Sequence, residues 1–186
     1  MNLFAIVGPS GSGKTSVVNA LKSYGIKTME ENYIGSYPSR FSNRELLSKW
    51  SWIARWIELV WDFKLTGTTV IVSDRCPLEV VPYATEGILL LESLNSTIME
   101  FQNHDVWIRT IYLRVPLQIC FERSRERLHR EPCRQIYGEE DLDYVTSIYA
   151  FYEKSVGNLW DFTIEASERS IEEIVDEIRR IIDRNS

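Results

Sequence analysis

One segment near the start of the chain constrains the possible folds more than any other. It reads Gly8-Pro9-Ser10-Gly11-Ser12-Gly13-Lys14-Thr15 and fits the pattern G-x-x-x-x-G-K-[ST]. An apolar run precedes it and a helical pattern follows it, which is the context that this motif requires. Glycines let backbone N–H groups turn inward around phosphate oxygens, and the start of the following helix adds its positive end. The segment therefore predicts a phosphate-binding loop between a strand and a helix.

The end of this loop carries the groups for nucleotide chemistry. We expect all eight residues to bind the phosphates of ATP, with the Lys14 side chain reaching the β- and γ-phosphates. The Thr15 hydroxyl is the expected ligand of Mg²⁺. The alternative is a glycine-rich turn with an incidental lysine, but the position between strand and helix favours the motif.

Composition describes one ordinary globular domain, expected over residues 1–186. The chain has 186 residues, of which 44% are hydrophobic and 26% charged, enough to form a continuous core. A net charge of −6 argues against a protein that coats nucleic acid or anionic membranes, so nucleic acid is expected only as an acceptor.

Cysteine spacing and the N-terminal residues indicate the compartment. The cysteines Cys76, Cys120 and Cys133 have no paired or metal-type spacing, which predicts reduced thiols without a catalytic role. The first apolar run, of about five residues, is too short for a signal peptide or a membrane span. We therefore expect a soluble, cytoplasmic protein that has no contact with a membrane.

Short apolar runs alternate with longer stretches of helical spacing, which predicts an α/β fold with a parallel sheet covered by helices. The predicted strands are Leu3–Val7, Ile26–Met29, Thr69–Val72, Ile108–Val115 and Asp161–Ile164. A helix is expected over Lys14–Leu21, ending near Gly25.

Two Ser-x-x-Glu capping boxes predict helix starts. Ser42 and Glu45 precede a long helix with an expected buried stripe of Leu46, Leu47, Trp50, Ile53, Ala54, Ile57 and Trp61. Ser170 and Glu173 precede the last helix, with an expected buried face of Ile171, Ile174, Val175, Ile178 and Ile182.

Charged residues follow two of the other predicted strands. The carboxyl ends of parallel strands share one edge of the sheet, so Asp74, Arg75, Glu30 and Glu31 should all lie near the phosphate loop. Asp74 would hold Mg²⁺ or orient an acceptor hydroxyl, and Arg75 would neutralise phosphate charge. One of the two glutamates would accept a proton from that hydroxyl. A purely orienting role, or a role as loop charges, is an equal alternative.

An arginine cluster predicts a lid over approximately residues 123–138. Its members are Arg123, Arg125, Arg127, Arg130 and Arg134. All except Arg125 follow the spacing i, i+4, i+7, i+11, which is one face of a helix, although Pro132 is expected to end that helix before Arg134. Arg123, Arg127 and Arg130 are the catalytic candidates. The alternative is a solvated helix whose arginines pair with neighbouring glutamates.

Three residues of the long helix lie off its predicted stripe. Trp52 and Trp56 could stack on a flat base while Arg55 meets an acceptor phosphate. The alternative is that these aromatic side chains belong to the core. His104 and His129 show no metal or triad pattern and are expected at the surface.

Several segments together resemble the thymidylate kinase and deoxynucleoside kinase group of P-loop kinases, over nearly the full chain. VIVSDRCPLEVVPYA looks like the family's strand and Asp-Arg motif, with Tyr83 at the offset of a tyrosine in thymidylate kinases. IYLRVPLQICFERSRERLHRE is similar to the fourth strand, the Pro-containing turn and the arginine-bearing lid. DLDYVTSIYAFY and DFTIEASERSIEEIVDEI resemble the helix after the lid, the last strand and the last helix.

This resemblance implies a P-loop kinase fold with a five-stranded parallel sheet in the order 2-3-1-4-5, Mg-ATP as donor, Tyr83 as an acceptor contact, and often a homodimer. There are three departures from the family pattern. The second strand ends in MEENY, without the Arg-Glu-Pro or Glu-Pro of relatives. Arg114 stands where relatives usually have an acid, and Cys76 replaces the usual Tyr, His or Ser.

The sequence therefore predicts a kinase that transfers the γ-phosphoryl group of ATP to a deoxynucleoside monophosphate, thymidylate-like by preference, or to a deoxynucleoside. A second hypothesis keeps the fold but changes the acceptor to a small metabolite hydroxyl or to a modified base in nucleic acid. A third is a non-catalytic module that uses ATP as a conformational signal. The arginines and carboxylates argue against the third, because a sensor needs no acceptor chemistry.

Overall fold

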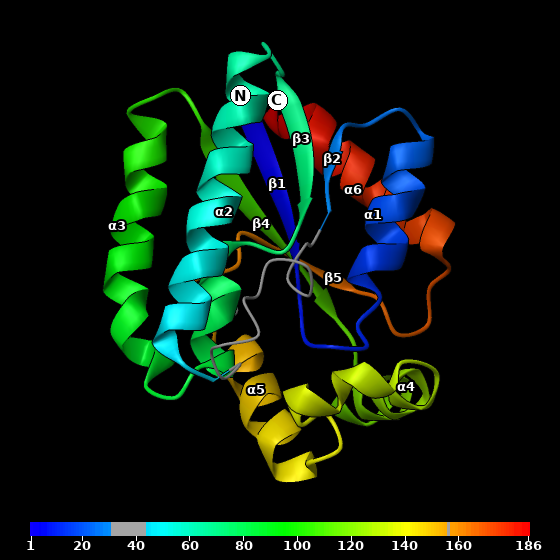
Figure 1. The fold of residues 1–186 in the computed structure, drawn as a ribbon. Coiled ribbons are helices and arrows are strands. Elements are labelled where there is room, and N and C mark those ends of the chain that lie inside the picture. Colours follow the sequence, from blue (N-terminus) through cyan, green and yellow to red (C-terminus); the bar gives the residue numbers. More distant parts are fainter. Residues whose placement is uncertain (31–43, 156) are drawn as a thin grey trace.

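The computed structural model describes residues 1–30, 44–155 and 157–186 (Figure 1). Within these ranges, five parallel strands form one sheet in the order β2-β3-β1-β4-β5. The strands are β1 (Asn2–Val7), β2 (Thr28–Met29), β3 (Val70–Asp74), β4 (Trp107–Arg114) and β5 (Phe162–Glu165). The predicted α/β fold and strand order are confirmed, and each strand lies within a few residues of its predicted range.

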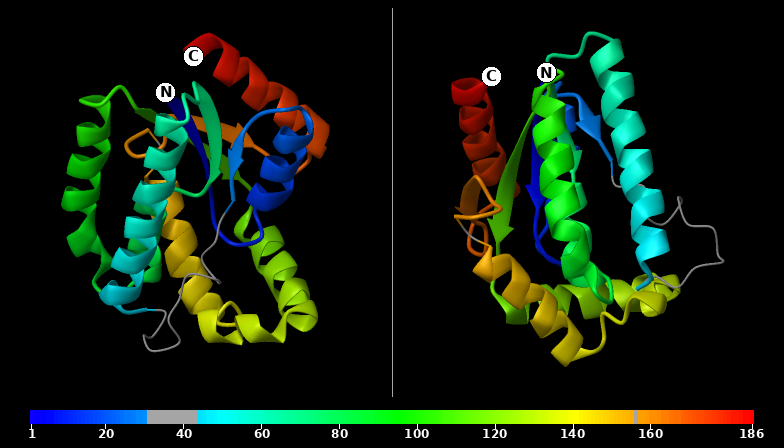
Figure 2. Two further views of the ribbon diagram at one scale, coloured as in Figure 1. Left: turned by 45° about the horizontal axis from the view of Figure 1, so that its top comes forward. Right: turned by 90° about the vertical axis from the view of Figure 1, so that its left-hand side faces the viewer.

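Helices cover both faces of the sheet and its carboxyl edge (Figures 1 and 2). The α-helices are α1 (Lys14–Ser23), α2 (Leu46–Leu65), α3 (Leu91–Gln102), α4 (Leu117–Arg130), α5 (Leu142–Lys154) and α6 (Ile171–Asn185). Short 3-10 helices are η1 (Pro77–Tyr83), η2 (Gly87–Leu90) and η3 (Pro132–Tyr137). Helices α4 and α5 lie across the end of the sheet where the strands finish, opposite the two termini. They therefore face the predicted phosphate loop.

Alternation along β1 divides the core into two layers, since successive side chains of a strand point to opposite faces. Leu3, Ala5 and Val7 pack with residues of α2, α3 and α5. Phe4 and Ile6 pack on the other face with residues of α1 and α6. Both faces of β1 are fully buried, as expected for a central strand of a parallel sheet.

The last helix follows its prediction in its capping box and in four of the five residues of its predicted buried face; the prediction is wrong for Ile171. The Ser170 hydroxyl accepts from the Glu173 N–H, and the Glu173 carboxylate accepts from the Ser170 N–H, so the capping box is complete. The buried residues are Ile174, Val175, Ile178 and Ile182, whereas Ile171 is exposed.

The predicted buried stripe of α2 is only partly correct. Ile53 is buried, and Leu46, Ile57 and Trp61 pack against the core, but Ala54 is exposed. The residue before this helix is Glu45, whose side chain makes no capping hydrogen bond, and Ser42 lies outside the described residues. Leu47 and Trp50, placed on the buried stripe by the prediction, are 59% and 43% exposed. The residues that are buried are Ser48, Lys49, Trp52, Ile53, Trp56 and Val60. Apolar residues occur all round this helix, so its neighbours decide which face is covered.

Trp56 shows how those neighbours act. Its ring packs edge to face on Phe101 of α3, with the ring centroids 6.0 Å apart. Its Nε1–H donates to Ser73 Oγ of β3 at 3.2 Å. These contacts from α3 and β3 rotate the tryptophan face of α2 inward.

Two further expectations concern thiols and membranes. Cys76, Cys120 and Cys133 are all free, and the first two are buried, in agreement with the predicted reduced thiols. Among the helices of the described ranges, none combines the length and the apolar character needed to cross a membrane.

Candidate functional site

The predicted phosphate loop joins β1 to α1 and curls around the Lys14 side chain. Lys14 Nζ donates to the carbonyl oxygens of Gly8 at 2.5 Å and Pro9 at 3.0 Å. Gly13, directly before α1, has a φ of 94°, which a residue with a side chain rarely adopts. A Cβ on Gly11 would lie 2.3 Å from the carbonyl oxygen of Cys120 in α4. Glycine at this position therefore lets the loop pack directly against α4.

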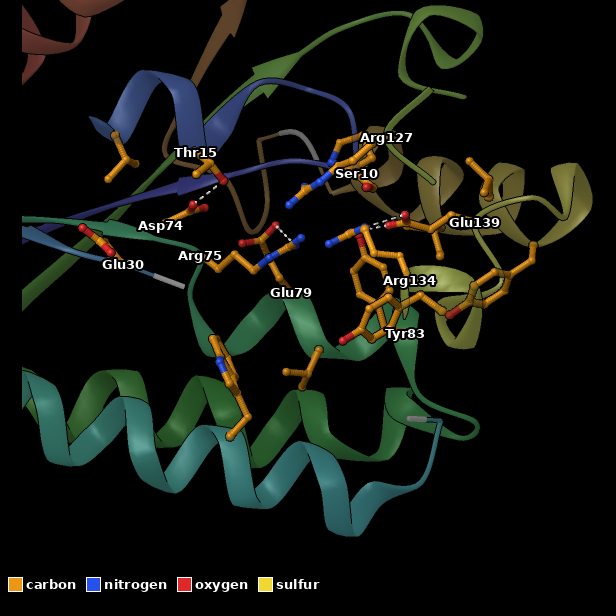
Figure 3. A pocket seen from close by; sticks show the side chains of 18 of the residues that line it. Ser10, Thr15, Glu30, Asp74, Arg75, Glu79, Tyr83, Arg127, Arg134 and Glu139 are labelled. Atoms are coloured by element: carbon orange, nitrogen blue, oxygen red, sulfur yellow. Dashed lines mark hydrogen bonds and ion pairs between the residues drawn. The ribbon is translucent and has the colours of Figure 1, made fainter. Parts of the chain in front are cut away.

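Thr15 and Asp74 meet beside this loop (Figure 3). Strands β1 and β3 are neighbours, and their register pairs Ile6 with Asp74, which places the end of β3 next to the start of α1. Thr15 Oγ1 donates to Asp74 Oδ2 at 2.7 Å, and Asp74 is almost fully buried. A hydroxyl and a carboxylate are the oxygen donors that a hard cation such as Mg²⁺ takes.

The donor set fits Mg²⁺ bound partly by nucleotide. Among the described residues, no cluster of three or more His, Cys, Asp or Glu side chains could hold a metal ion alone. Mg²⁺ in phosphate-transfer sites is commonly held by one or two protein oxygens together with phosphate oxygens and water. Thr15 and Asp74 match that requirement.

Glu79 is a buried carboxylate that the sequence analysis missed. It lies in η1, is 2% exposed, and its Oε1 accepts from the Gly8 N–H at 3.0 Å and from the Tyr152 hydroxyl at 2.6 Å. Arg75 Nη1 lies 3.4 Å from the same oxygen. Burial raises the pKa of the Glu79 carboxyl, while the charges of Arg75 and Lys14 act in the opposite direction. The available signal was an acid inside the apolar segment that follows Asp74.

Lys49 is a second buried charge without a predicted role. It lies on the covered face of α2 and is fully buried. Burial, with a smaller contribution from the positive charge of Arg75, lowers the pKa of the Lys49 ammonium to about 7. Burial and Arg75 therefore both disfavour the charged form of Lys49.

A cleft of about 250 Å³ runs from the phosphate loop to α5. Its polar wall contains Thr15, Asp74, Arg75 and Glu79. Its apolar wall contains Trp52 of α2, Val80 and Tyr83 of η1, Tyr137 of η3, and Tyr144 and Ile148 of α5. Arg134 and Glu139 form a buried ion pair in the wall, with Arg134 Nη2 and Glu139 Oε1 2.8 Å apart (Figure 3).

The cleft brings together many, but not all, of the residues singled out from the sequence. Pro9, Ser10, Thr15, Glu30, Trp52, Asp74, Arg75, Tyr83 and Arg127 line it. Gly11, Gly13 and Lys14 line an adjoining hollow, together with Arg127. Gly8 and Ser12 complete the loop, and Ser12 is buried within it. Glu31 lies outside the described residues.

The structure corrects the predicted grouping of Trp52, Arg55 and Trp56. Trp52 lines the cleft, but Trp56 is a core residue held by Ser73 and Phe101. Arg55 is half exposed and pairs with Glu58 at 3.0 Å. Trp52 and Trp56 lie on one buried face of α2, but only Trp52 reaches the cleft, and Arg55 lies outside that face.

The predicted arginine face divides into two parts. Arg123 Nη1 donates to the Gly11 carbonyl at 3.3 Å, and Arg127 lines both hollows while pairing with Glu131 at 3.2 Å. Arg130 is exposed and lies 3.6 Å from Glu126. The helix ends at Arg130, as the proline suggested, and Arg134 is buried in η3. Of the four arginines on the predicted face, Arg123 and Arg127 therefore lie beside the phosphate loop. Arg130 lies at the surface and Arg134 lies in η3.

Comparison with known proteins agrees with this architecture. A family model described as "AAA domain" matches residues 3–135. No curated protein matches the sequence.

Solved structures show the same fold. Deoxyadenosine kinase from M. mycoides, with dCMP and dCDP bound, is 19% identical with a TM-score of 0.64, and the match covers 99% of this chain and 100% of that one. The dATP-bound form has a TM-score of 0.66 at 19% identity, covering 97% and 98%. Shikimate kinase from Acinetobacter baumannii, in complex with shikimate, has a TM-score of 0.56 at 16% identity, covering 100% and 94%. The described chain thus has the P-loop kinase fold.

Proposed function

This chain belongs to the AAA domain family, and on that premise we propose that it is an Mg-ATP-dependent kinase for a deoxynucleoside monophosphate or a deoxynucleoside. The observation that carries the proposal is the cleft that continues from the phosphate loop into an aromatic pocket (Figure 3). Such a cavity holds a phosphate donor and a flat acceptor side by side. Holding two reactants in this way removes much of the entropic barrier to transfer.

At the donor end, residues Gly8–Thr15 would bind the phosphates of ATP. The Lys14 ammonium, which now bonds to two loop carbonyls, would turn to the β- and γ-phosphates. Thr15 and Asp74 would hold Mg²⁺, which when bound neutralises charge on the phosphates. Arg75 and Arg127, both on the cleft wall, would stabilise the charge on the transferring group.

At the acceptor end, aromatic side chains offer surfaces on which a base would stack. Trp52, Tyr83, Tyr137 and Tyr144 belong to this wall, and base-to-aromatic stacking stabilises binding by about 1–3 kcal/mol per base. The cleft suits a small molecule better than a polymer. The M. mycoides enzyme of the same fold binds dCMP and dATP, which supports this class of acceptor.

We also propose that residues 1–186 act as one P-loop kinase domain in which residues 123–138 form the lid. Arg123 and Arg127 are the lid residues nearest the phosphate loop. Closure over bound nucleotide would exclude water from the transferring phosphoryl group.

An ADP-release assay tests the proposal. The purified protein is incubated with Mg-ATP and, separately, thymidine, dTMP, other deoxynucleosides and their monophosphates, small hydroxy acids, and DNA containing hydroxymethylated bases. ADP release that depends on a deoxynucleoside or its monophosphate supports the proposal. Release only with a hydroxy acid or DNA replaces the acceptor, and ATP binding without release for any acceptor indicates a sensor.

A further inference from the structure

Glu79 lies where the phosphate loop, the end of β3 and helix α5 meet. Its side chain rises from η1 toward the Thr15–Asp74 pair and the loop (Figure 3). Oε1 receives the Gly8 N–H and the Tyr152 hydroxyl and lies beside Arg75. These three donors, from three separate parts of the chain, hold the carboxylate in one orientation.

The second oxygen of this carboxylate differs from the first in its hydrogen bonding. Glu79 Oε2 is buried and has no hydrogen-bond partner among the described residues. A buried carboxylate oxygen without a donor is costly, and in folded proteins such an exception calls for an explanation. Because Glu79 lines the cleft, a hydroxyl group of a molecule bound there would supply the missing donor.

We propose that Glu79 accepts the proton of the acceptor hydroxyl, through Oε2, during phosphoryl transfer; this assignment rests on the proposed kinase function. The acceptor oxygen forms a bond to the γ-phosphorus. The bond from that phosphorus to the oxygen bridging to the β-phosphate breaks, and ADP leaves with the electron pair. The hydroxyl proton moves to Oε2 and is released to water after the product departs.

Among the described carboxylates that line the cleft, Glu79 meets the geometric requirement better than Glu30 and Asp74, and Glu139 is already paired with Arg134. The Glu30 side chain is 61% exposed and pairs with the Lys22 ammonium at 2.7 Å, so it faces solvent. Asp74 already accepts the Thr15 hydroxyl and is assigned to Mg²⁺. Glu79 instead bonds to the first residue of the phosphate loop and feels the charge of Lys14. That places it near the expected γ-phosphate, within reach of an acceptor oxygen.

The electrostatic surroundings suit a proton acceptor. The groups that act on Glu79 from the packed elements are Arg75, Lys14, Tyr152, Tyr83 and Cys76. Tyr83, Cys76 and Tyr152 are the neutral groups in this set, and burial raises the pKa of each. The pKa of Tyr83 rises to about 12, and the pKa values of Cys76 and Tyr152 rise well above their ordinary values, so all three groups stay protonated. Burial also raises the pKa of Glu79, and a higher pKa makes a carboxylate a stronger base.

Glu79→Gln is the central test because glutamine keeps the shape. Its amide oxygen still accepts from Gly8 and Tyr152, so the loop and α5 remain connected, but the side chain no longer takes a proton. We expect kcat to fall by about 10²- to 10⁴-fold, the range for general base catalysis, with the Kd for Mg-ATP changed less than about two-fold. The fall in kcat at low pH, which in the wild type would report protonation of Glu79, should disappear from the kcat–pH profile. A kcat near that of the wild type, or a loss confined to ATP binding, overturns the assignment.

Tyr152→Phe provides a second readout that a structural role alone would not move. The Tyr152 hydroxyl lowers the pKa of Glu79, so its removal raises that pKa. The acid limb of kcat, which reports deprotonation of the base, should then move to higher pH. Tyr149→Phe is the control. It removes a hydroxyl from the same helix, but Glu153 is the charge with the largest effect on the pKa of Tyr149, so this variant should leave the acid limb of the kcat–pH profile in place. Equal behaviour of the two variants contradicts the proposal.

Failure of the kinase function and failure of the role of Glu79 give different results. If the wild-type protein binds Mg-ATP but phosphorylates no acceptor of the panel, the kinase function fails and the role of Glu79 falls with it. If the wild type turns over and Glu79→Gln does so equally fast, only the role of Glu79 fails.

Discussion

The two ends of the cleft are built in different ways. The donor end consists largely of one continuous segment, Gly8–Thr15, whose backbone and glycine conformations form the binding surface. The acceptor end is assembled from side chains of α2, η1, η3 and α5, which are far apart in the sequence. If the two ends bind donor and acceptor as proposed, binding of phosphate depends on local structure, whereas recognition of the acceptor depends on how distant elements pack.

Lys14→Ala should have the largest effect on activity. It removes the ammonium proposed to meet the β- and γ-phosphates of ATP, so phosphoryl transfer should fall by on the order of 10³-fold, while the fold persists. Steady-state kinetics and thermal melting check both parts. Lys64→Ala, which alters a partly exposed lysine bonded to the Asp105 carbonyl, is the control. Near-normal turnover in a well-folded Lys14→Ala protein would remove the phosphate loop from the mechanism.

Arg127→Ala should lower kcat by about 10²-fold, because this arginine lines both hollows and would meet charge that develops during transfer. The affinity for ATP should change less, since stabilisation confined to the transition state is expressed in kcat. Arg125, which packs on the Phe121 ring with its Cζ 5.8 Å from the centroid, is the matched control, and Arg125→Ala should be milder. Equal losses of kcat at both positions would indicate that the arginine cluster is only the solvated surface of a helix.

Glu139→Gln separates the acceptor end from the donor end. The substitution weakens the buried pair with Arg134 and leaves an arginine with reduced compensation, so stability should fall by roughly 2–4 kcal/mol. The KM for the acceptor should rise by about ten-fold, while the Kd for Mg-ATP stays nearly constant. Urea unfolding, acceptor kinetics and ATP-binding measurements check these effects. A parallel loss of ATP affinity would show that the two ends are not independent.

Arg55→Ala should have the smallest effect. The side chain is 51% exposed and its contact is with Glu58 on the same helix, a type of pair that contributes about 0.3–0.5 kcal/mol. Acceptor KM and kcat should both match the wild type, with Trp52→Ala as the comparison inside the cleft. An increase in acceptor KM for Arg55→Ala would restore the original grouping of these residues and contradict the observed register of α2.

Local patterns were sufficient where the interacting residues are close in sequence. The glycine motif, the Ser170–Glu173 capping box and the strand positions depend on contiguous residues or short periods, and the structure agrees with them. The end of α4 at Arg130 also follows from one local cause, the proline that comes after it.

Long-range packing decided the remainder. Helix α2 has apolar residues all round, so its sequence alone does not select a buried face; contacts with α3 and β3 turn Trp56 inward. Arg134 resembles the other arginines of the cluster in sequence, but it lies in η3 rather than in α4, where Glu139, five residues further on, holds it in the cleft wall; this contact is local, but the sequence analysis did not identify it. The resemblance to nucleotide kinases indicated the strand order in advance, because homologous chains preserve the connections between elements more strongly than side-chain contacts.

The sequence by itself determined the phosphate loop, the parallel α/β sheet and the placement of Asp74 and Arg75 at its carboxyl edge, since each follows from short-range periodicity and strand direction. Only the tertiary structure decided that Glu79 is a buried group of the cleft. Its partners Gly8 and Tyr152 lie 71 and 73 residues away. Neither the burial of its carboxylate nor the lack of a hydrogen-bond partner for Oε2 among the described residues arises until β1, η1 and α5 pack together.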